Sequence, residues 1–156
     1  MGLVDIYDES GDFLQRLVTG GALAAPWGVA LAPASGFGSL SGDLLVGNFS
    51  YVDSGINAFN PTTGVWEGSI AINPGAGDTP GGLWGLAFGN GGSAGSPDIL
   101  YFNDGINGER DGLFGAISVP EPSTWAMMFI GFGGLGLVAA RRRRGASWTP
   151  GGARVS

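Results

Sequence analysis

The sequence predicts an all-β body followed by a single apolar C-terminal helix. The chain has 156 residues, of which 32 are glycine and only 13% are charged, a composition that favours many tight turns over long helices. Short apolar runs recur between Gly, Asn, Asp, Pro and Ser, which is typical of strands. A run of 18 uncharged, mostly apolar residues, 123–140, lies near the C-terminus and has the length of a helix that crosses a membrane.

The charge is divided between the two parts of the chain. The net charge is −6, but residues 1–120 hold 12 acidic residues and two basic ones, Arg16 and Arg110. Residues 121–156 hold one glutamate and five arginines. The body is therefore strongly acidic and repels phosphate, which excludes nucleic acid as its partner.

Cysteine and histidine are both absent. The lack of cysteine excludes disulfides, thiolate chemistry and zinc-thiolate sites. The lack of histidine excludes Ser-His-Asp catalysis, histidine-bound metals and the usual general base at neutral pH. We therefore expect no catalytic residue, no metal site and no cofactor, and the protein is not expected to be an enzyme.

Two segments of the body repeat the same order of motifs. PWGVALAP at 26–33 returns as GLWGLAFG at 82–89, so that Trp27 and Trp84 lie 57 residues apart. The strand GDLLVGNF at 42–49 returns as PDILYFND at 97–104. With these strands aligned, Asp43 corresponds to Asp98 and Asn48 to Asn103. A further element follows each pair, INAFNPTTG at 56–64 and GLFGAI at 112–117, and an earlier copy of it opens the chain at 4–17.

These repeats predict units of four antiparallel strands. In the complete unit we expect strands at 26–32, 43–49, 56–60 and 65–70, with a glycine turn at NPTTG. Residues 4–18 would supply the last two strands of a preceding unit, and 83–117 about three strands of a following one. Four antiparallel strands that repeat at roughly 40 to 50 residues are the blade of a β-propeller. The predicted fold is thus a partial β-propeller, one full blade plus two partial blades, followed by a transmembrane helix.

PWGVALAP followed by GDLLVGNF and INAF resembles the repeats of NHL-type propellers. The whole order of motifs over residues 3–118 resembles a family of uncharacterised bacterial exported proteins. Closing a propeller ring takes about four blades or more, and residues 1–25 hold neither a basic region nor a long apolar core of the signal-peptide type. Two interpretations stay open: the chain is the C-terminal part of a longer protein, or it is a short protein that completes a ring by oligomerising.

The C-terminal run has the features of a membrane span. A helix over 123–140 would be about 27 Å long, just enough for a thin hydrocarbon core. Apolar positions within it are Trp125, Phe129, Ile130, Leu135 and Leu137. Arg141, Arg142, Arg143 and Arg144 follow at once and would stay in the cytoplasm. A buried core helix and a basic nucleic-acid patch are the alternatives, and neither explains why the two features are adjacent.

VPEPSTWAMMFIGFGGLGLVAARRRR at 119–144 resembles the PEP-CTERM sorting signal. The resemblance implies that Pro120, Glu121 and Pro122 are recognised by a membrane-embedded sorting protease of the exosortase class, and that the arginines stop transfer. It also implies a single-pass intermediate in the inner membrane, with the C-terminus in the cytoplasm. The protein would later be located at the cell surface or outside the cell, where exopolysaccharide is a candidate partner. Residues 145–156 extend beyond the usual end of the motif, and we expect them to be disordered.

The sequence thus divides into the blades at 1–118, the sorting signal at 119–144 and the tail at 145–156. For the blades we expect a binding or structural role. The alternatives are a propeller hydrolase or lyase with most of its active site in missing blades, and a permanently anchored single-pass protein. Asp104, Glu109 and Asp111 are the densest carboxylate cluster and the alternative candidates for a Ca²⁺ site, but their spacing is not that of an EF-hand and such residues in glycine-rich loops usually form turns, so no metal site is predicted. Trp27 and Trp84 are interpreted as packing between blades in preference to stacking on a sugar ring.

Overall fold

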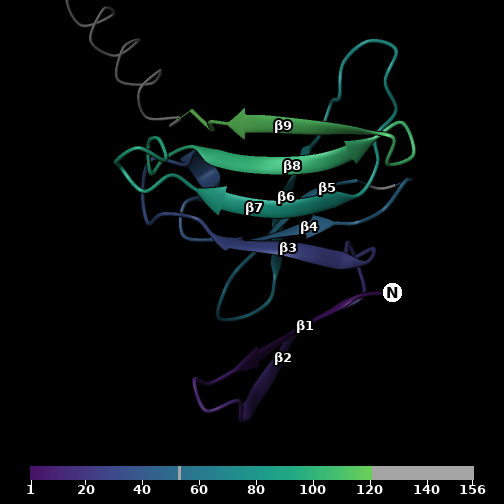
Figure 1. The fold of residues 1–156 in the computed structure, drawn as a ribbon. Coiled ribbons are helices and arrows are strands. Elements are labelled where there is room, and N and C mark those ends of the chain that lie inside the picture. The colour runs from purple at the N-terminus through teal and green to yellow at the C-terminus, as the bar shows by residue number, and fades with distance from the viewer. Residues whose placement is uncertain (53, 121–156) are drawn as a thin grey trace, which may run out of the picture. The chain divides into compact units, whose positions relative to one another are not determined.

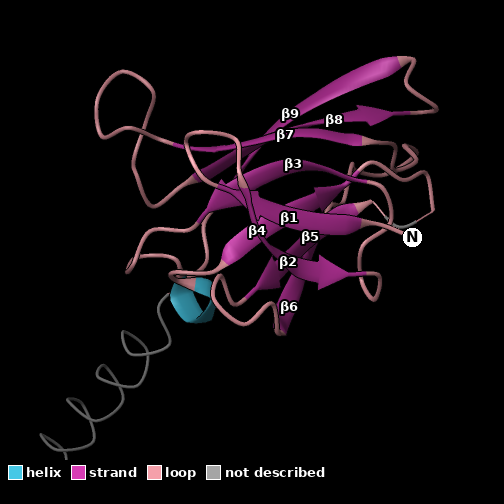
Figure 2. Cartoon of the chain, turned by 90° about the horizontal axis from the view of Figure 1, so that it is seen from below, coloured by secondary structure: helices cyan, strands magenta, loops and turns pink. Residues whose placement is uncertain are grey.

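The structure is a computed structural model that describes residues 1–52 and 54–120, and in these residues it is all-β (Figure 1). One turn of 3-10 helix, η1 (Gly38–Leu40), interrupts the strands (Figure 2). The strands are β1 (Leu3–Tyr7), β2 (Phe13–Thr19), β3 (Pro26–Leu31), β4 (Leu44–Asn48), β5 (Gly55–Phe59), β6 (Trp66–Ala71), β7 (Leu83–Phe88), β8 (Leu100–Ile106) and β9 (Asp111–Ile117).

The strands form three antiparallel sheets. Their strand orders are β1-β2, β3-β4-β5-β6 and β7-β8-β9, so every strand pairs with its neighbour in the chain. The predicted strands are confirmed, as is their distribution over groups of two, four and three. The predicted transmembrane helix at 123–140 lies outside the described residues. Within those residues, no helix has the length and apolar character that a membrane crossing requires.

Two turns of the same kind join the strands of the first two sheets. Asp8 accepts hydrogen bonds from two amides of the β1-β2 turn through Oδ1, and Asn60 does the same in the β5-β6 turn. Gly11 and Gly64 follow with φ of +87° and +69°, which other residues rarely adopt. The predicted glycine turns DESG and NPTTG are therefore confirmed, and their side-chain acceptors explain why Asp or Asn opens them.

The core lies between the sheets, because alternate residues of each strand face opposite sides. Leu45 of β4 belongs to a cluster with the β7-β9 sheet, whereas its neighbour Val46 belongs to a second cluster with β2. The first cluster contains Ala32, Phe37, Leu40, Leu45, Ile56, Ala58, Ile72, Leu83, Leu100 and Phe102. The second contains Val18, Leu23, Val46 and Phe59. The four-stranded sheet thus packs on both faces, although Val29 and Leu31 of β3 remain exposed on the side of the second cluster.

The pairing of strands shifts the sequence alignment of the two repeats by one residue. Pro26 pairs with Asn48 next to a bulge in β3, and Leu83 pairs with Asp104 next to a bulge in β7. Asn48 therefore corresponds to Asp104 and not to Asn103. The reason is the loop length: Leu31 pairs with Leu44, but Phe88 pairs with Leu100, so the second connection is one residue shorter.

Candidate functional site

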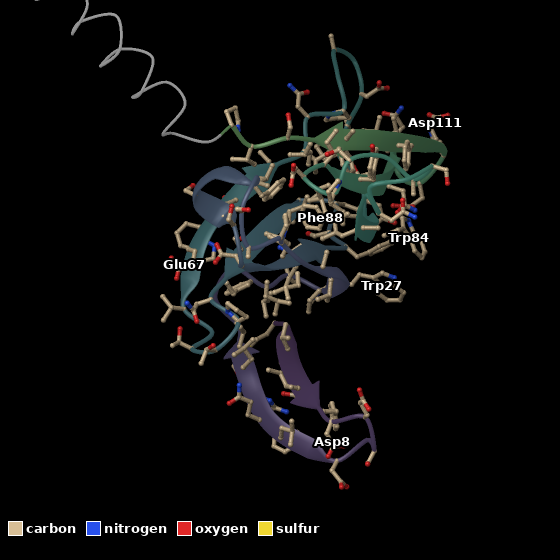
Figure 3. All side chains as sticks on the ribbon, turned by 90° about the vertical axis from the view of Figure 1, so that its left-hand side faces the viewer. Asp8, Trp27, Glu67, Trp84, Phe88 and Asp111 are labelled. Carbon is tan, nitrogen blue, oxygen red and sulfur yellow. The ribbon has the colours of Figure 1, made fainter. Side chains whose placement is uncertain are left out.

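Four aromatic rings gather where the bulged ends of β3 and β7 meet, and we call Trp27, Phe49, Tyr51 and Trp84 the aromatic cluster. The ring centroids of Trp27 and Trp84 are 5.7 Å apart, at an interplanar angle of 78°, and the two side chains lie close together in Figure 3. Phe49 contacts both, at 5.8 Å and 4.9 Å, and Tyr51 at 6.0 Å. The prediction that the two tryptophans pack together is confirmed.

The chain folds this way locally because glycine leaves room for a ring. An isolated bridge pairs Phe49 with Gly82, and any side chain at Gly82 would overlap the ring of Phe49. The bulges next to Trp27 and Trp84 turn both side chains to the same side. The rings are packed edge to face and are also accessible, since Trp27 is 62% exposed, Tyr51 56% and Trp84 43%.

Glu109 holds Trp84 in place from the β8-β9 turn. Its Oε2 accepts a hydrogen bond of 2.9 Å from Trp84 Nε1, and its Oε1 accepts one of 2.8 Å from the amide of Gly82. Glu109 itself has a positive φ of 64°, an uncommon conformation for this residue type. The carboxylate therefore fixes the orientation of an exposed indole, as a preorganised binding surface requires.

Strand β8 contains a buried carboxyl group. Asp104 is 2% exposed; it accepts a hydrogen bond of 3.3 Å from Ser54 Oγ and one from the Gly81 amide. Its Oδ2 has no hydrogen-bond partner. Burial raises the pKa of Asp104, the two hydrogen bonds lower it, and the nearby Glu109 raises it. Burial outweighs the hydrogen bonds, so the net change is upward.

Asp104, Glu109 and Asp111 do not assemble into a metal site. Asp104 and Glu109 are engaged as described above, and Asp111 accepts a hydrogen bond from Asn107 Nδ2. Asn107 also bonds Asp78 and the Thr79 amide, which ties the loop before β7 to the β8-β9 turn. Among residues 1–52 and 54–120, no group of three or more acidic side chains could hold a metal ion. Glu109 lies in the β8-β9 turn and Asp111 begins β9, whereas Asp104 lies within β8.

Only the first residue of the predicted recognition tripeptide is described. Pro120 is exposed, and Val119 before it is half-buried against the core cluster of the β7-β9 sheet. A side chain at Gly38 of η1 would overlap Val119. The other predicted residues of the sorting signal lie outside the described part of the chain, namely Glu121, Pro122, Trp125, Phe129, Ile130, Leu135, Leu137 and Arg141, Arg142, Arg143 and Arg144.

Sequence reasoning missed half of the aromatic cluster. Phe49 and Tyr51 follow β4 in a loop, and nothing in their spacing links them to Trp84 in β7. The contact is made by the bridge between Phe49 and Gly82, which leaves no signal in the sequence. The role of Glu109 was also missed, because its partner Trp84 lies 25 residues away in the chain.

The described residues define an all-β protein body that exposes an oriented aromatic cluster at one end of its sheets. Residues 118–144 of the chain match the family model of the PEP-CTERM protein-sorting motif. This motif indicates exosortase-dependent sorting of an exported protein, with a membrane-associated intermediate. The resemblance drawn from the C-terminal sequence is thereby confirmed. No curated protein and no solved structure matches the chain.

Proposed function

We propose that the protein is delivered to the cell surface or the extracellular matrix through a single-pass intermediate in the inner membrane. The match of residues 118–144 to the sorting motif carries the proposal. Pro120, Glu121 and Pro122 are the recognition residues for an exosortase-type protease. The apolar segment 123–140, which includes Trp125 and Leu137, spans the membrane in this proposal, and Arg141 to Arg144 remain in the cytoplasm.

The position of the tripeptide, directly after the last strand of the body, supports this proposal. Ile117 closes β9, and Val119 still packs against the core. The tripeptide therefore follows the folded sheet directly, without a linker. A protease that reads Pro120 to Pro122 works at the boundary of the body, and cutting after it would separate the apolar segment while leaving all nine described strands intact.

Mass spectrometry of the surface-associated protein tests the sorting step. The full chain, exported from a Gram-negative host by an added signal peptide, is compared in strains with and without the sorting protease. We expect Arg141–Arg144 to be missing from the mature protein only when the protease is present. Glu121→Ala with Pro122→Ala abolishes that loss, whereas Val65→Ala, at an exposed position outside the matched motif, leaves it unchanged. Arginines retained in both strains would instead indicate a permanent anchor.

For the body, the proposal is a partial β-propeller with a binding rather than a catalytic role. Two sheets with the same strand order and the same bulge support the propeller, together with the first strands of these sheets, β3 and β7, lying side by side (Figure 1). Adjacent blades of a propeller place their first strands next to each other in this way. The exposed rings Trp27 and Trp84 supply a surface on which a sugar ring could stack.

Exopolysaccharide is the proposed ligand of the aromatic cluster, and co-sedimentation tests it. The full chain is mixed with neutral polysaccharide from the producing host, and the bound fraction is measured. Trp27→Ala is expected to reduce binding about fivefold or more, since an exposed aromatic contact contributes roughly 1 kcal/mol or more. Val65→Ala, in the exposed β5-β6 turn, is the matched control. If both variants bind polysaccharide as well as the parent does, the aromatic cluster is not the binding site.

A further inference from the structure

One face of the β7-β8-β9 sheet is apolar and open. Tyr101 of β8 and Phe114 of β9 stack on it with ring centroids 5.9 Å apart and an interplanar angle of 10°, and Phe114 is 73% exposed. A hollow of about 500 Å³ adjoins them. Its lining is Ala87, Phe88, Ser93, Ala94, Gly95, Tyr101 and Phe114. No charged side chain lines this hollow, so its surface suits an apolar partner.

The corresponding face of the four-stranded sheet is completely covered. Strand pairing equates Leu45 with Tyr101 and Ile56 with Phe114, because Leu45 pairs with Ala58 as Tyr101 pairs with Ala116. Leu45 and Ile56 have no exposed surface. They pack in the cluster that contains Leu83, Leu100 and Phe102 of the next sheet.

The chain therefore shows what covers a face of this kind. In the covered case the occupant is the opposite face of another antiparallel sheet of the same repeat, packed sheet on sheet. The open face has the same position and register and is mainly apolar, with Asn103 as a polar residue opposite Phe114. An occupant of the same type is a sheet with aliphatic and aromatic residues on its outer side and few charges.

Within the described residues, the β1-β2 hairpin has exposed apolar side chains on both of its strands, whereas the exposed Val29 and Leu31 lie in β3, at the edge of the four-stranded sheet. Leu3, Tyr7, Phe13 and Leu14 are each about half exposed, and Tyr7 and Phe13 are in edge contact at 5.7 Å. The charges within the hairpin strands, Asp5 and Arg16, neutralise each other through an ion pair of 2.8 Å. The two strands of the hairpin can thus be buried in an interface without leaving an unpaired charge there.

We propose that the Tyr101–Phe114 face is an interface with a second copy of this chain, whose β1-β2 hairpin packs on it. The contact joins two different surfaces, so it is heterologous and either closes a ring or continues from copy to copy. A ring closed by two copies would contain the three sheets of each chain. The inference is independent of the sorting function, because it depends only on the body.

Disulfide trapping tests the interface directly, since the chain contains no cysteine. Full-length Phe114→Cys and Phe13→Cys proteins are purified separately in detergent, mixed and oxidised with a mild catalyst. We expect the mixture to give a covalent dimer in at least about tenfold higher yield than either protein alone. Val65→Cys, exposed in the β5-β6 turn, mixed with Phe114→Cys is the matched control and should give only background. A dimer from Phe114→Cys alone at equal yield would overturn the hairpin as the occupant.

The mass of the unmodified protein provides the second measurement. Light scattering of the full chain should give a mass above that of the monomer, and Phe114→Asp should lower it to the monomer at the same concentration. Val65→Asp should leave it unchanged. The urea midpoint of Phe114→Asp should match the parent, because Phe114 is largely exposed within one chain. A monomeric parent chain with no mixed disulfide overturns the proposal.

Discussion

The four-stranded and three-stranded sheets are two versions of one repeat in different surroundings. Both have a bulge beside a tryptophan in their first strand and the same antiparallel order. The first sheet packs against a neighbour on both faces, and Leu45 is fully buried. The second exposes one face, and Tyr101 stands where Leu45 does. Local sequence therefore defines the sheet, whereas the neighbouring sheet decides which of its residues belong to the core.

Truncating the equivalent residues Leu45 and Tyr101 should give the largest difference between the two sheets. Leu45→Ala leaves a cavity between two packed sheets and should lower the free energy of unfolding by about 3 kcal/mol. Tyr101→Ala removes one ring of an exposed stacked pair and should cost about 1 kcal/mol. Urea unfolding of the full chain in detergent, followed by tryptophan fluorescence, measures both values.

The comparison has an internal check. Ile56→Ala should behave like Leu45→Ala, because Ile56 is fully buried in the same cluster. Phe114→Ala should behave like Tyr101→Ala at protein concentrations where the chain is monomeric. Equal losses for Leu45→Ala and Tyr101→Ala under those conditions would show that the Tyr101 face is covered within the chain, contrary to the structure.

Much of the fold could be predicted from sequence because strand and turn signals are local. The alternation in INAF and the apolar run in DLLVGNF place β5 and β4 within a residue or two. Asn60 and Gly64 mark their turn through a side-chain acceptor and a positive φ. These signals act over a few residues, so they are readable without knowledge of the packing.

The correspondence between sheets and the candidate site could not be predicted in the same way. The loop between β7 and β8 is one residue shorter than the loop between β3 and β4. The sequence alignment therefore matches Asn103 with Asn48, whereas in the structure Asp104 occupies the position of Asn48. In a strand, one residue changes the face of the sheet. The contact of Glu109 with Trp84 and that of Phe49 with Gly82 join distant segments, and such contacts leave no period in the sequence.

Asn48 of the four-stranded sheet and Asp104 of the three-stranded sheet occupy corresponding positions, so exchanging them tests the comparison between the two sheets. The first variant is Asn48→Asp. Asn48 is fully buried; its Oδ1 accepts from the Ala24 amide and its Nδ2 donates to the Ala22 carbonyl. A carboxylate keeps the first bond and loses the donor, which leaves two oxygens facing each other in a buried place. We expect a loss of about 2 kcal/mol in the free energy of unfolding.

The pH dependence of this loss distinguishes charge from shape. Protonating the new carboxyl restores a donor, so the loss should shrink as the pH falls toward about 4, the ordinary range of aspartate. Asn48→Ser, which is smaller and uncharged, is the control and should show a loss that does not vary with pH. An Asn48→Asp variant as stable as the parent at pH 7 would mean that this position is hydrated in solution.

The reverse exchange, Asp104→Asn, should have the smallest effect and the opposite sign. Burial raises the pKa of Asp104, so the native state binds its proton more tightly than the unfolded chain, where the pKa is about 3.9. Above the raised native pKa both states are ionised and the buried charge is unfavourable. As the pH falls through the interval between the two pKa values, the native state is protonated first and the parent gains stability.

An asparagine has no such transition and, as Asn48 illustrates, fits a β-strand position of this kind. At pH 7 we expect Asp104→Asn to be more stable than the parent by about 1 kcal/mol, and this advantage should disappear as the pH falls toward about 4. The pKa of Asp43 is also raised by burial, with a further contribution from Glu67, but Asp43 is present in both proteins. The difference between the two urea curves, measured from pH 4 to pH 8, therefore isolates Asp104. A difference that stays constant over this range would mean that Asp104 is ionised alike in the folded and unfolded chains.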